Sequence, residues 1–400
     1  MKALFVHSTR LVRAPDGRVY SRSAFPYRAW ARYREHFPHL TVAARMADGS
    51  VVSEQWDVSS GHGVQFAGLP DDHGRWWHQA RAGAATDILD REVAAADAII
   101  VRQSRHGWIA ARLAQRQGKP WAVEVVGDAW RAYWNHGHWL AKLYAPVAAW
   151  QTRRWIAQAP FALYVTSRYL QGLYPCGGHA EHTSNVDFPG GAEHVLRERI
   201  SRSSTGGFAA SSPQAGMIGS LNTRYKGLAV ALQALRRLRK KGFPVRLRVL
   251  GAGNLEAWRT EAKALGVDDL LELDGTLPSG EPVFQWLDRL DFYMQPSFQE
   301  GLPRALIEAM SRGLPALASS CGGIPELLPP DCLHRPGDER KLAADMERMI
   351  RDAEWRAAQP PRNFETARDY CAEALEKRRH AFWARFADFA RARRPGEGRY

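Results

Sequence analysis

Two carboxylates, Glu300 and Glu308, are separated by about two helical turns in the second half of the chain. Pro303, between them, suits the first turn of a helix, where its missing N–H costs nothing. The backbone amides just after Glu300 would lie unpaired at the positive end of the helix dipole, which favours an anion such as a phosphate. Both carboxylates could then face one cleft. A helix with an acidic start and one solvated glutamate is the plainer interpretation, and this stretch alone leaves both open.

This helix needs a strand before it, and the second half of the chain supplies strands and helices in alternation. A buried strand over 291–294 leads into the turn that ends at Glu300. Further strands are expected over 216–219, 245–250, 270–273 and 315–318, and helices over 226–239, 255–265 and 281–290. Such alternation predicts a parallel sheet whose strand ends meet at one edge.

The first half of the chain is expected to follow the same rhythm. A strand over 2–7 precedes a βαβ unit made of a strand over 94–102, a helix over 108–117 and a strand over 120–126. This unit predicts parallel pairing with a right-handed crossover. Asp128 comes just after the carboxyl end of its last strand, where ligands bind in open α/β sheets.

Length and charge limit the possible architectures and partners. A chain of 400 residues is long for one hydrophobic core and suits two domains. The small, polar residues between about 187 and 214 predict the connection between them. The formal net charge of +13 implies an anionic partner, which could be nucleic acid, an acidic membrane surface or a phosphorylated ligand.

Metal, disulfide and membrane-spanning features are not expected. The 4 cysteines are scattered without a C-x-x-C pair, so neither a zinc site nor a disulfide framework is indicated, and a reducing cytoplasm is the natural expectation. The apolar run at the N-terminus is too short for a signal peptide, and no run approaches membrane-spanning length. The histidines within 70–81 and 136–138 lack carboxylate or cysteine partners at metal-binding spacing.

An aromatic and cationic segment over 25–37 has two interpretations. Trp30, Tyr33 and Phe37 fall on one helical face, and arginines lie off that face. The segment is either a first helix packed on the sheet or an interfacial helix that touches an anionic membrane. The sequence leaves both possible.

The second half of the chain resembles the retaining glycosyltransferases of family 4, which have the GT-B fold. Its motifs agree with that family in order and spacing over about 214–328, and this shared order is far more specific than any single motif. The motifs are Gly219, Lys226-Gly227, Gly251-Ala252-Gly253, Gly275, Pro296-Ser297, the pair Glu300-x7-Glu308, Gly313-Leu314-Pro315 and Gly322-Gly323-Ile324-Pro325-Glu326. The first half is looser, with similar elements at 97–101, 123–128 and 184–187.

The resemblance implies an α/β protein of the GT-B fold, in which two Rossmann-like domains face each other across a cleft. An acceptor-binding domain would occupy residues 1–190 and a linker residues 191–214. A nucleotide-sugar-binding domain would occupy residues 215–375, and a C-terminal helix over 376–400 would return to the N-terminal domain.

The implied activity is transfer of a sugar from a nucleotide-diphosphate sugar, UDP- or GDP-linked, with retention of anomeric configuration. Catalytic roles would fall to Glu300, Lys226 and Asp128, while Glu308 would bind the donor ribose. The implied donor-binding residues are Gly219, Arg224, Lys226, Gly251, Gly253, Thr276, Leu277, Ser297, Glu300, Gly301, Leu302, Pro303, Arg304 and Glu308. A glycosidase-like acid and base pair is set aside, because the family pattern places Glu308 on the ribose and a diphosphate leaving group needs no protonation.

Two positions depart from the family pattern. Many relatives carry arginine where Ser220 stands, and Arg224 could replace it on the diphosphate. Many relatives also carry histidine where Gly127-Asp128 stands, which would leave Asp128 to bind a sugar or acceptor hydroxyl. No Asp-x-Asp motif follows a strand, and cationic side chains would neutralise the diphosphate, so neither a metal nor another cofactor is expected.

The expected acceptor is a lipid-linked or polysaccharide glycan of a bacterium. We expect the enzyme in the cytoplasm, with possible peripheral contact with anionic lipid at the inner face of the membrane. The alternatives are a GT-B nucleotide-sugar epimerase, transfer to a soluble small molecule and, more distantly, an α/β protein that binds nucleic acid, which the resemblance does not favour. A dinucleotide oxidoreductase is disfavoured, because Glu256 stands where the third glycine of that fingerprint belongs.

Overall fold

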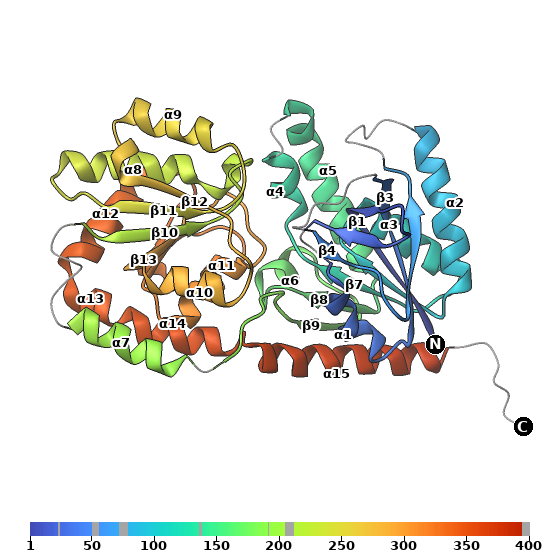
Figure 1. The fold of residues 1–400 in the computed structure, drawn as a ribbon. Helices are drawn as coiled ribbons and strands as arrows, with labels where there is room; N and C mark the ends of the chain where they lie inside the picture. Colours follow the sequence, from blue (N-terminus) through green and yellow to red (C-terminus); the bar gives the residue numbers. More distant parts are fainter. Residues whose placement is uncertain are drawn as a thin grey trace, which may run out of the picture.

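The chain forms two α/β lobes side by side, with helix α15 (Ala372–Arg391) running beneath the N-terminal lobe (Figure 1). The computed structural model describes residues 1–22, 25–49, 56–71, 79–135, 138–190, 192–204 and 212–393. At 79–82 and 202–204 it describes the backbone alone. The predictions about the histidine and tryptophan segment at 72–78 and the turn at 136–137 lie outside the described residues.

The N-terminal lobe is built on a mostly parallel sheet. Its strand order is β4-β2-β1-β6-β7-β8-β9, with β3 paired to β1 and β5 paired to β3. Among the described strands, β2 pairs antiparallel with both β1 and β4, and the other pairs are parallel. The central strands are buried on both faces, as is usual in parallel sheets. The strands are β1 (Lys2–Arg13), β2 (Val19–Ser21), β3 (His39–Asp48), β4 (Asp57–Val58), β5 (Val64–Leu69), β6 (Ala98–Arg102), β7 (Trp121–Val125), β8 (Phe161–Tyr164) and β9 (His179–His182).

Helices connect these strands, and α3, α4 and α5 begin at a side-chain cap. Ser104 is the N-cap of α3, and its hydroxyl accepts a hydrogen bond from the Gly107 amide at 3.1 Å. The helical segments are η1 (Tyr27–Trp30), α1 (Ala31–Arg34), α2 (Gln79–Ala95), α3 (Arg105–Arg116), α4 (Ala129–Trp134), α5 (Trp139–Ile156) and α6 (Tyr169–Leu173). The predicted βαβ unit is therefore present as β6, α3 and β7, with parallel pairing.

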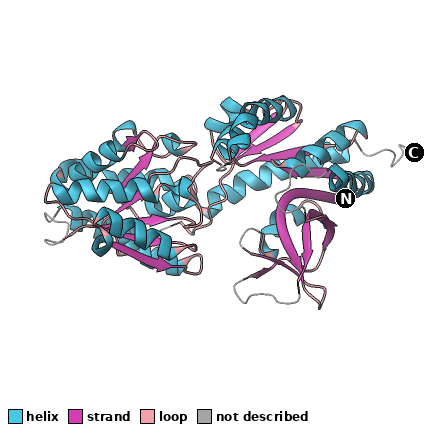
Figure 2. Ribbon diagram, turned by 90° about the horizontal axis from the view of Figure 1, so that it is seen from above, coloured by secondary structure: helices cyan, strands magenta, loops and turns pink. Residues whose placement is uncertain are grey.

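The C-terminal lobe contains a fully parallel sheet of order β12-β11-β10-β13-β14-β15. Its strands are β10 (Gln214–Ile218), β11 (Arg246–Leu250), β12 (Leu271–Gly275), β13 (Phe292–Gln295), β14 (Ala316–Ser319) and β15 (Leu333–His334). Its helices are α8 (Leu228–Lys240), α9 (Leu255–Leu265), α10 (Glu281–Asp288), α11 (Arg304–Ser311), α12 (Glu339–Arg351), α13 (Ala353–Ala357) and α14 (Gln359–Arg368). Both faces of the sheet are covered by helices (Figures 1 and 2).

The segment predicted as a linker over 191–214 carries a packed helix, α7 (Glu193–Ser204). This helix contacts α13 and α14 of the C-terminal lobe. Its buried Arg199 donates hydrogen bonds to the backbone oxygens of Leu290 at 2.8 Å and Arg312 at 2.9 Å. Most residues of α7 are charged or polar, and its packing partners lie far away in the sequence. The sequence therefore suggested a flexible connection here.

Helix α15 returns from the C-terminal lobe to the N-terminal lobe, as predicted. Phe382, Trp383 and Phe386 are almost fully buried and complete a core cluster with residues of β1, α1 and β8. The chain passes from one lobe to the other twice, near Phe188 and near Ala372. The Ala372 amide donates a hydrogen bond to the Phe188 carbonyl at 3.0 Å, which joins these two segments. Burial of large aromatic side chains fixes the returning helix in place.

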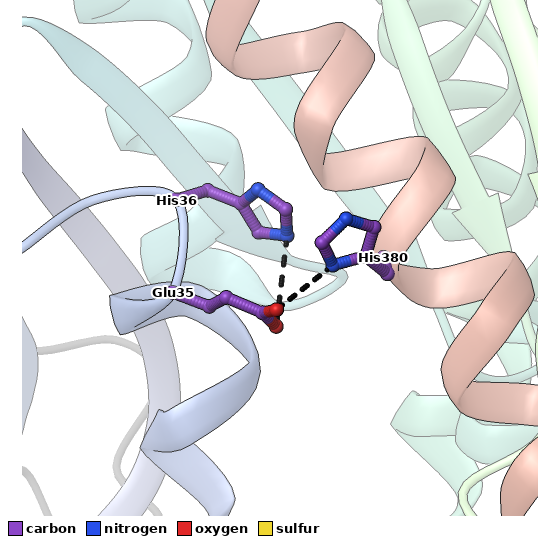
Figure 3. Close-up of side chains that lie close together, drawn as sticks. All are labelled: Glu35, His36 and His380. Atoms are coloured by element: carbon purple, nitrogen blue, oxygen red, sulfur yellow. Dashed lines mark ion pairs between the residues drawn. The ribbon is translucent and has the colours of Figure 1, made fainter.

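A polar cluster adds to this contact between α15 and the end of α1. The Glu35 carboxylate lies 3.0 Å from Nδ1 of His380 and 4.0 Å from Nε2 of His36 (Figure 3). Among the described residues, this is the one group of three metal-ligand side chains that come close together. Glu35 and His380 are more than half exposed, and burial lowers the pKa of His36. The group is therefore best described as a polar contact at the surface.

The aromatic segment over 25–37 is part of the core. Trp30, Tyr33 and Phe37 have at most 2% of their surface exposed. The Tyr33 hydroxyl donates to the buried Glu124 carboxylate on β7 at 2.5 Å. This segment therefore packs on the sheet, and its interpretation as an interfacial helix is wrong. In the described part of the chain, no helix is both long and apolar enough to cross a membrane.

Candidate functional site

The loops that follow β10 and β11 interlock at the edge of the C-terminal sheet. A Cβ atom on Gly251 would lie 1.8 Å from the carbonyl oxygen of Gly219. Gly253 has φ +150°, and a Cβ atom there would lie 2.5 Å from the Leu221 carbonyl carbon. Glycine is required at these predicted positions because the backbones are in direct contact.

Lys226 is brought to the end of β13 by a second close approach. Gly227 has φ +82°, and a Cβ atom there would lie 1.9 Å from the carbonyl oxygen of Pro296. The stem of Lys226 packs against Gly219, whose Cβ position would lie 3.0 Å from its Cγ. The predicted motifs at 219, 226 and 296 therefore form one site.

Glu300 is held by three donors on a single oxygen. Its Oε1 accepts hydrogen bonds from Lys226 Nζ at 2.8 Å, Ser297 Oγ at 2.8 Å and Gln295 Nε2 at 3.0 Å. No described residue donates to Oε2. Glu300 also lines a cavity of about 1230 Å³ between the lobes. One carboxylate oxygen is therefore fixed, and the other is left to meet a ligand.

A buried tyrosine sets the orientation of Gln295, a residue that the sequence analysis missed. The Tyr293 hydroxyl donates to Gln295 Oε1 at 2.9 Å and accepts from the Ile218 amide at 3.2 Å. The amide nitrogen of Gln295 therefore points to Glu300. The available signal was a polar residue at the carboxyl end of a buried strand.

The start of α11 carries the predicted anion-binding amides. The amides of Gly301, Leu302 and Arg304 make no hydrogen bond to any described residue. A Cβ atom on Gly301 would lie 2.5 Å from the carbonyl oxygen of Val126 at the end of β7, so this turn approaches the other lobe. Pro303 is the N-cap residue, with φ −73°.

Glu308 lies on α11 and lines the same cavity as Glu300. Desolvation by burial raises its pKa, Arg304 opposes that shift, and Asp187 on the opposite wall adds to it. The Glu308 carboxylate makes no hydrogen bond or ion pair with a described residue. A half-buried carboxylate of this kind is available to accept hydrogen bonds from ligand hydroxyls.

The opposite wall of the cavity comes from the N-terminal lobe and is rich in arginine. Arg32 lies 3.4 Å from the Asn185 side-chain oxygen in the turn that the sequence matched at 184–187. The other arginines of the N-terminal lobe on this wall are Arg28, Arg34 and Arg102. The cleft therefore joins anion-binding groups of both lobes.

Arg224 lies apart from the Glu300 cluster. Its Nη2 donates to both carboxylate oxygens of Glu261, at 2.9 and 3.1 Å, and its guanidinium stacks over Trp258 at 5.1 Å. The side chain is 71% exposed. The structure therefore places Lys226, and not Arg224, beside Glu300.

The Asp128 carboxylate is surrounded by protein hydrogen-bond donors. It is the N-cap of α4, and its side chain accepts hydrogen bonds from the Trp130 and Arg131 amides. The hydroxyls of Tyr169 and Tyr174 also donate to it, at 2.8 and 3.0 Å. Both oxygens therefore accept hydrogen bonds from protein donors, and the binding of a sugar or acceptor hydroxyl by Asp128 stays a prediction. An aspartate directly before a helix was the missed capping signal.

The predicted donor residues Thr276 and Leu277 follow β12 and are exposed. The Gly251 amide donates to the Gly275 carbonyl at 2.6 Å, which joins the loops after β11 and β12. Ser279 and Gly280, a little further along, line the cavity. Thr276 and Leu277 themselves are not among the residues that line the cavity around Glu300.

Glu326 joins the two lobes, a role that the sequence analysis missed. It accepts hydrogen bonds from the Ser167 amide and hydroxyl, both at 2.6 Å, from the Arg168 amide at 3.0 Å and from the Tyr169 amide at 2.6 Å. Its carboxylate thus satisfies the free amides where α6 begins in the other lobe. The sequence placed Glu326 only inside a matching motif.

Comparison with known proteins agrees with this geometry. Residues 212–352 match the family model "Glycosyl transferases group 1". Protein CapJ of Staphylococcus aureus is 27% identical over 380 residues, covering 94% of this chain and 93% of CapJ. The amylovoran biosynthesis glycosyltransferase AmsK of Erwinia amylovora is 38% identical over 137 residues, or 32% of this chain and 33% of AmsK.

Solved structures of low sequence identity share the fold over nearly the whole chain. Sucrose-phosphate synthase of Thermosynechococcus elongatus matches with TM-score 0.69 and 14% identity, over 97% of this chain and 100% of that one. HepE of Anabaena, solved with UDP-glucose, matches with TM-score 0.63 and 16% identity, over 98% and 100%. The predicted GT-B fold is confirmed, and the part of the chain over 212–352 is similar in sequence to group 1 glycosyltransferases.

Proposed function

We propose that this protein transfers a sugar from a nucleotide-diphosphate sugar to a glycan or glycolipid acceptor, with retention of anomeric configuration and without a metal ion. The observation that carries the proposal is the cluster in which Lys226, Ser297 and Gln295 all donate to Oε1 of Glu300 beside the free amides of α11. This cluster combines groups for a diphosphate with a group for sugar hydroxyls.

Departure of the nucleotide diphosphate would be assisted by fixed positive groups. As the glycosidic bond breaks, negative charge grows on the phosphate oxygens, and groups already aimed there stabilise the transition state more than the ground state. Lys226 and the amides of Gly301 and Leu302 are in position to do so. A bound diphosphate would compete with Glu300 for Lys226 and leave Glu300 free to meet the donor sugar.

Glu300 and Glu308 would have different roles in the reaction. Glu308 would accept hydrogen bonds from the ribose hydroxyls, because its carboxylate faces the cavity without a described protein partner. Glu300 is unsuited to act as an acid through Oε1, since that oxygen already accepts three hydrogen bonds. The acceptor hydroxyl would pass its proton to the departing phosphate oxygen, so attack occurs on the same face and no protein nucleophile is needed.

The names of similar proteins support this donor and acceptor class. Structures of HepE contain UDP and glucose or UDP-glucose. AmsK is named for amylovoran biosynthesis. A 2-deoxystreptamine glucosyltransferase of Streptomyces kanamyceticus, 30% identical over 164 residues, covering 39% of this chain and 40% of that protein, suggests a soluble acceptor as the second candidate.

A donor and acceptor screen tests the proposal. UDP- and GDP-sugars would be incubated with and without membrane lipid extracts, polysaccharide fragments or aminocyclitols, in the presence of a metal chelator. We expect nucleoside diphosphate release that depends on one acceptor fraction and survives the chelator. Interconversion of the nucleotide sugar without transfer would instead identify an epimerase, and a product with inverted anomeric configuration would exclude the retaining mechanism.

A further inference from the structure

Helices α4 and α5 belong to the N-terminal lobe, and α4 lies on the side that faces the C-terminal lobe (Figure 1). Both helices carry exposed aromatic and aliphatic side chains. Of the eleven large hydrophobic side chains that are exposed in the described chain, eight lie on these two helices. They are Trp130, Tyr133, Trp134, Trp139, Leu143, Tyr144, Val147 and Trp150, here called the hairpin face. A soluble monomer rarely exposes so many together unless the patch binds something.

The hairpin face is separate from the side of α5 that packs into the core of the lobe. On α5, Trp139, Leu143, Val147 and Trp150 follow each other by three or four positions and form one stripe. Trp139 and Leu143 are each 65% exposed and Trp150 is 58% exposed. The other side of α5 is buried against the lobe, at Ala145, Ala148, Thr152, Trp155 and Ile156. The helix is therefore already anchored, and its outer stripe remains available.

The charge around this face is of one sign. Residues 103–180 contain nine lysines and arginines and only two carboxylates, Glu124 and Asp128. Both of these carboxylates are buried, so this part of the N-terminal lobe presents no exposed acidic side chain. Lys142 lies 5.8 Å from the ring centre of Trp134, and Arg154 lies 5.4 Å from that of Trp150. These two cations therefore lie directly against aromatic rings of the hairpin face.

This chemistry fits one occupant better than others. Tryptophan and tyrosine rings beside lysine and arginine are typical of the interface between lipid headgroups and acyl chains. Exposed sugar-binding aromatic residues would be expected beside carboxylates for the sugar hydroxyls, and none is exposed here. A second copy of this chain would bring the same positive charge to the contact, which opposes pairing.

The hairpin face also leads into the cleft. A cavity of about 800 Å³ lies beneath it, lined by Trp134, Trp150 and Arg153 of the hairpin and by Phe298 and Pro336 of the C-terminal lobe. Arg131 on α4 donates to the Phe298 carbonyl at 3.1 Å, so α4 contacts the segment that precedes Glu300. A surface bound to this face would therefore lie next to the proposed site of transfer.

We infer that the hairpin face docks on an anionic lipid bilayer, with the aromatic side chains at headgroup depth and Lys142 and Arg154 on lipid phosphates. The inference deepens the proposed function only by suggesting that the acceptor arrives from that surface. Docking itself does not depend on the enzymatic reaction.

Vesicle co-sedimentation tests the electrostatic part of this inference. The full chain should bind vesicles of phosphatidylglycerol and phosphatidylcholine, bind pure phosphatidylcholine more weakly, and lose affinity as salt rises. Lys142→Glu with Arg154→Glu should weaken binding at least about tenfold, since each cation near an anionic surface is worth about 1 kcal/mol. The matched control is Arg236→Glu with Lys240→Glu, which makes the same change of −4 on exposed positions of α8 and should leave binding near that of the parent.

The apolar part needs a second variant. Replacing Trp139, Leu143 and Trp150 together by serine should reduce vesicle binding at least about tenfold without changing the thermal stabilisation by UDP. If the two charge variants, one on α5 and one on α8, lost vesicle affinity equally, binding would not be localised to the hairpin face and the inference would be overturned. Parent-like vesicle binding by the serine variant, or a dimer in solution that the same variant dissociates, would also overturn the inference. UDP-sugar turnover is scored separately, so vesicle binding without turnover would reject the proposed function and keep the docking surface.

Discussion

At the residue scale, the arrangement around Glu300 separates the two carboxylates that the sequence could only pair by spacing. Oε1 of Glu300 is filled by three donors, whereas Glu308 has a desolvated carboxylate without a described partner. The first is a fixed part of a polar network, and the second is available to bind hydroxyls. Substitutions at these positions should therefore have different kinetic effects.

We expect Glu300→Gln to lower kcat by at least about a hundredfold, the scale of losing a charged group positioned for the transition state. The new amide would also place an N–H group among the donors of Lys226, Ser297 and Gln295. Glu308→Gln should chiefly raise the KM for the donor, because ribose binding contributes to the ground state and transition state alike. Steady-state kinetics with the screened donor checks both, and unchanged kinetics in the pair would reject the assignment.

The different positions of Lys226 and Arg224 give a second prediction. Lys226→Ala should reduce kcat/KM by at least about a hundredfold, since it removes the cation beside the phosphate site. Arg224→Ala is the matched control and should change it by no more than about threefold, because Arg224 pairs with Glu261 on an exposed surface. If the control lost as much activity as Lys226→Ala, Arg224 would have to leave Glu261 and act on the diphosphate.

At the element scale, Glu326 connects the start of α6 to the C-terminal lobe. Glu326→Gln places an N–H group against backbone amides that now donate to a carboxylate. We expect the free energy of unfolding to fall by about 1 kcal/mol, because the donors to Glu326 are part-buried or exposed. Small-angle scattering should show a larger radius of gyration if the lobes separate. Glu281→Gln, at an exposed position on α10, is the control and should alter neither quantity.

Elements were easier to predict from the sequence than the contacts between them. Alternating apolar runs predicted the two parallel sheets, and the resemblance to family 4 glycosyltransferases placed Gly219, Gly251 and Lys226 in one site. Such glycine motifs can be recognised because close backbone approach leaves a mark in sequence. The packing of α7 and the four bonds of Glu326 left no such mark. They depend on partners that lie 91 positions or more away in the sequence, at Leu290 and Arg312 for Arg199 and at Ser167 for Glu326, which local patterns do not reveal.

Polar roles within the site were also only partly predictable. Asp128 was expected to bind a ligand, yet its oxygens cap α4 and accept bonds from two tyrosine hydroxyls. Capping and ligand binding use the same residue types at the same strand ends, so sequence alone could not separate them. Gln295 was missed because its function depends on the orientation that Tyr293 imposes.

At the scale of the whole molecule, buried histidines should make stability depend on pH. Burial lowers the pKa of His7 to about 3, with Arg102 adding to the shift, and burial lowers the pKa of His334 to about 4. The unfolded chain takes up these protons near pH 6.5, before the folded chain does. The contribution of these two histidines to the free energy of unfolding is therefore complete above about pH 6.5. It is lost as the pH falls from there towards 4 for His334 and towards 3 for His7.

We expect the unfolding temperature to rise with pH between 4 and 6.5. In His334→Leu, the number of protons taken up on unfolding in that window should fall by about one. The ring nitrogens of His334 make no hydrogen bond to a described residue, so this substitution breaks no polar contact that would confuse the result. Thermal unfolding across the pH series measures the slope, and an unchanged slope would contradict the assignment.

Helix α15 has a consequence for how the chain is made. The C-terminal lobe is contiguous in sequence, from α7 to α14, so it can complete its core as soon as those residues leave the ribosome. The N-terminal lobe is synthesised first, yet Phe382, Trp383 and Phe386 of α15 belong to the same core as Phe5 and Trp30. The lobe that is made first should therefore be the last to reach its native packing, once α15 has left the ribosome.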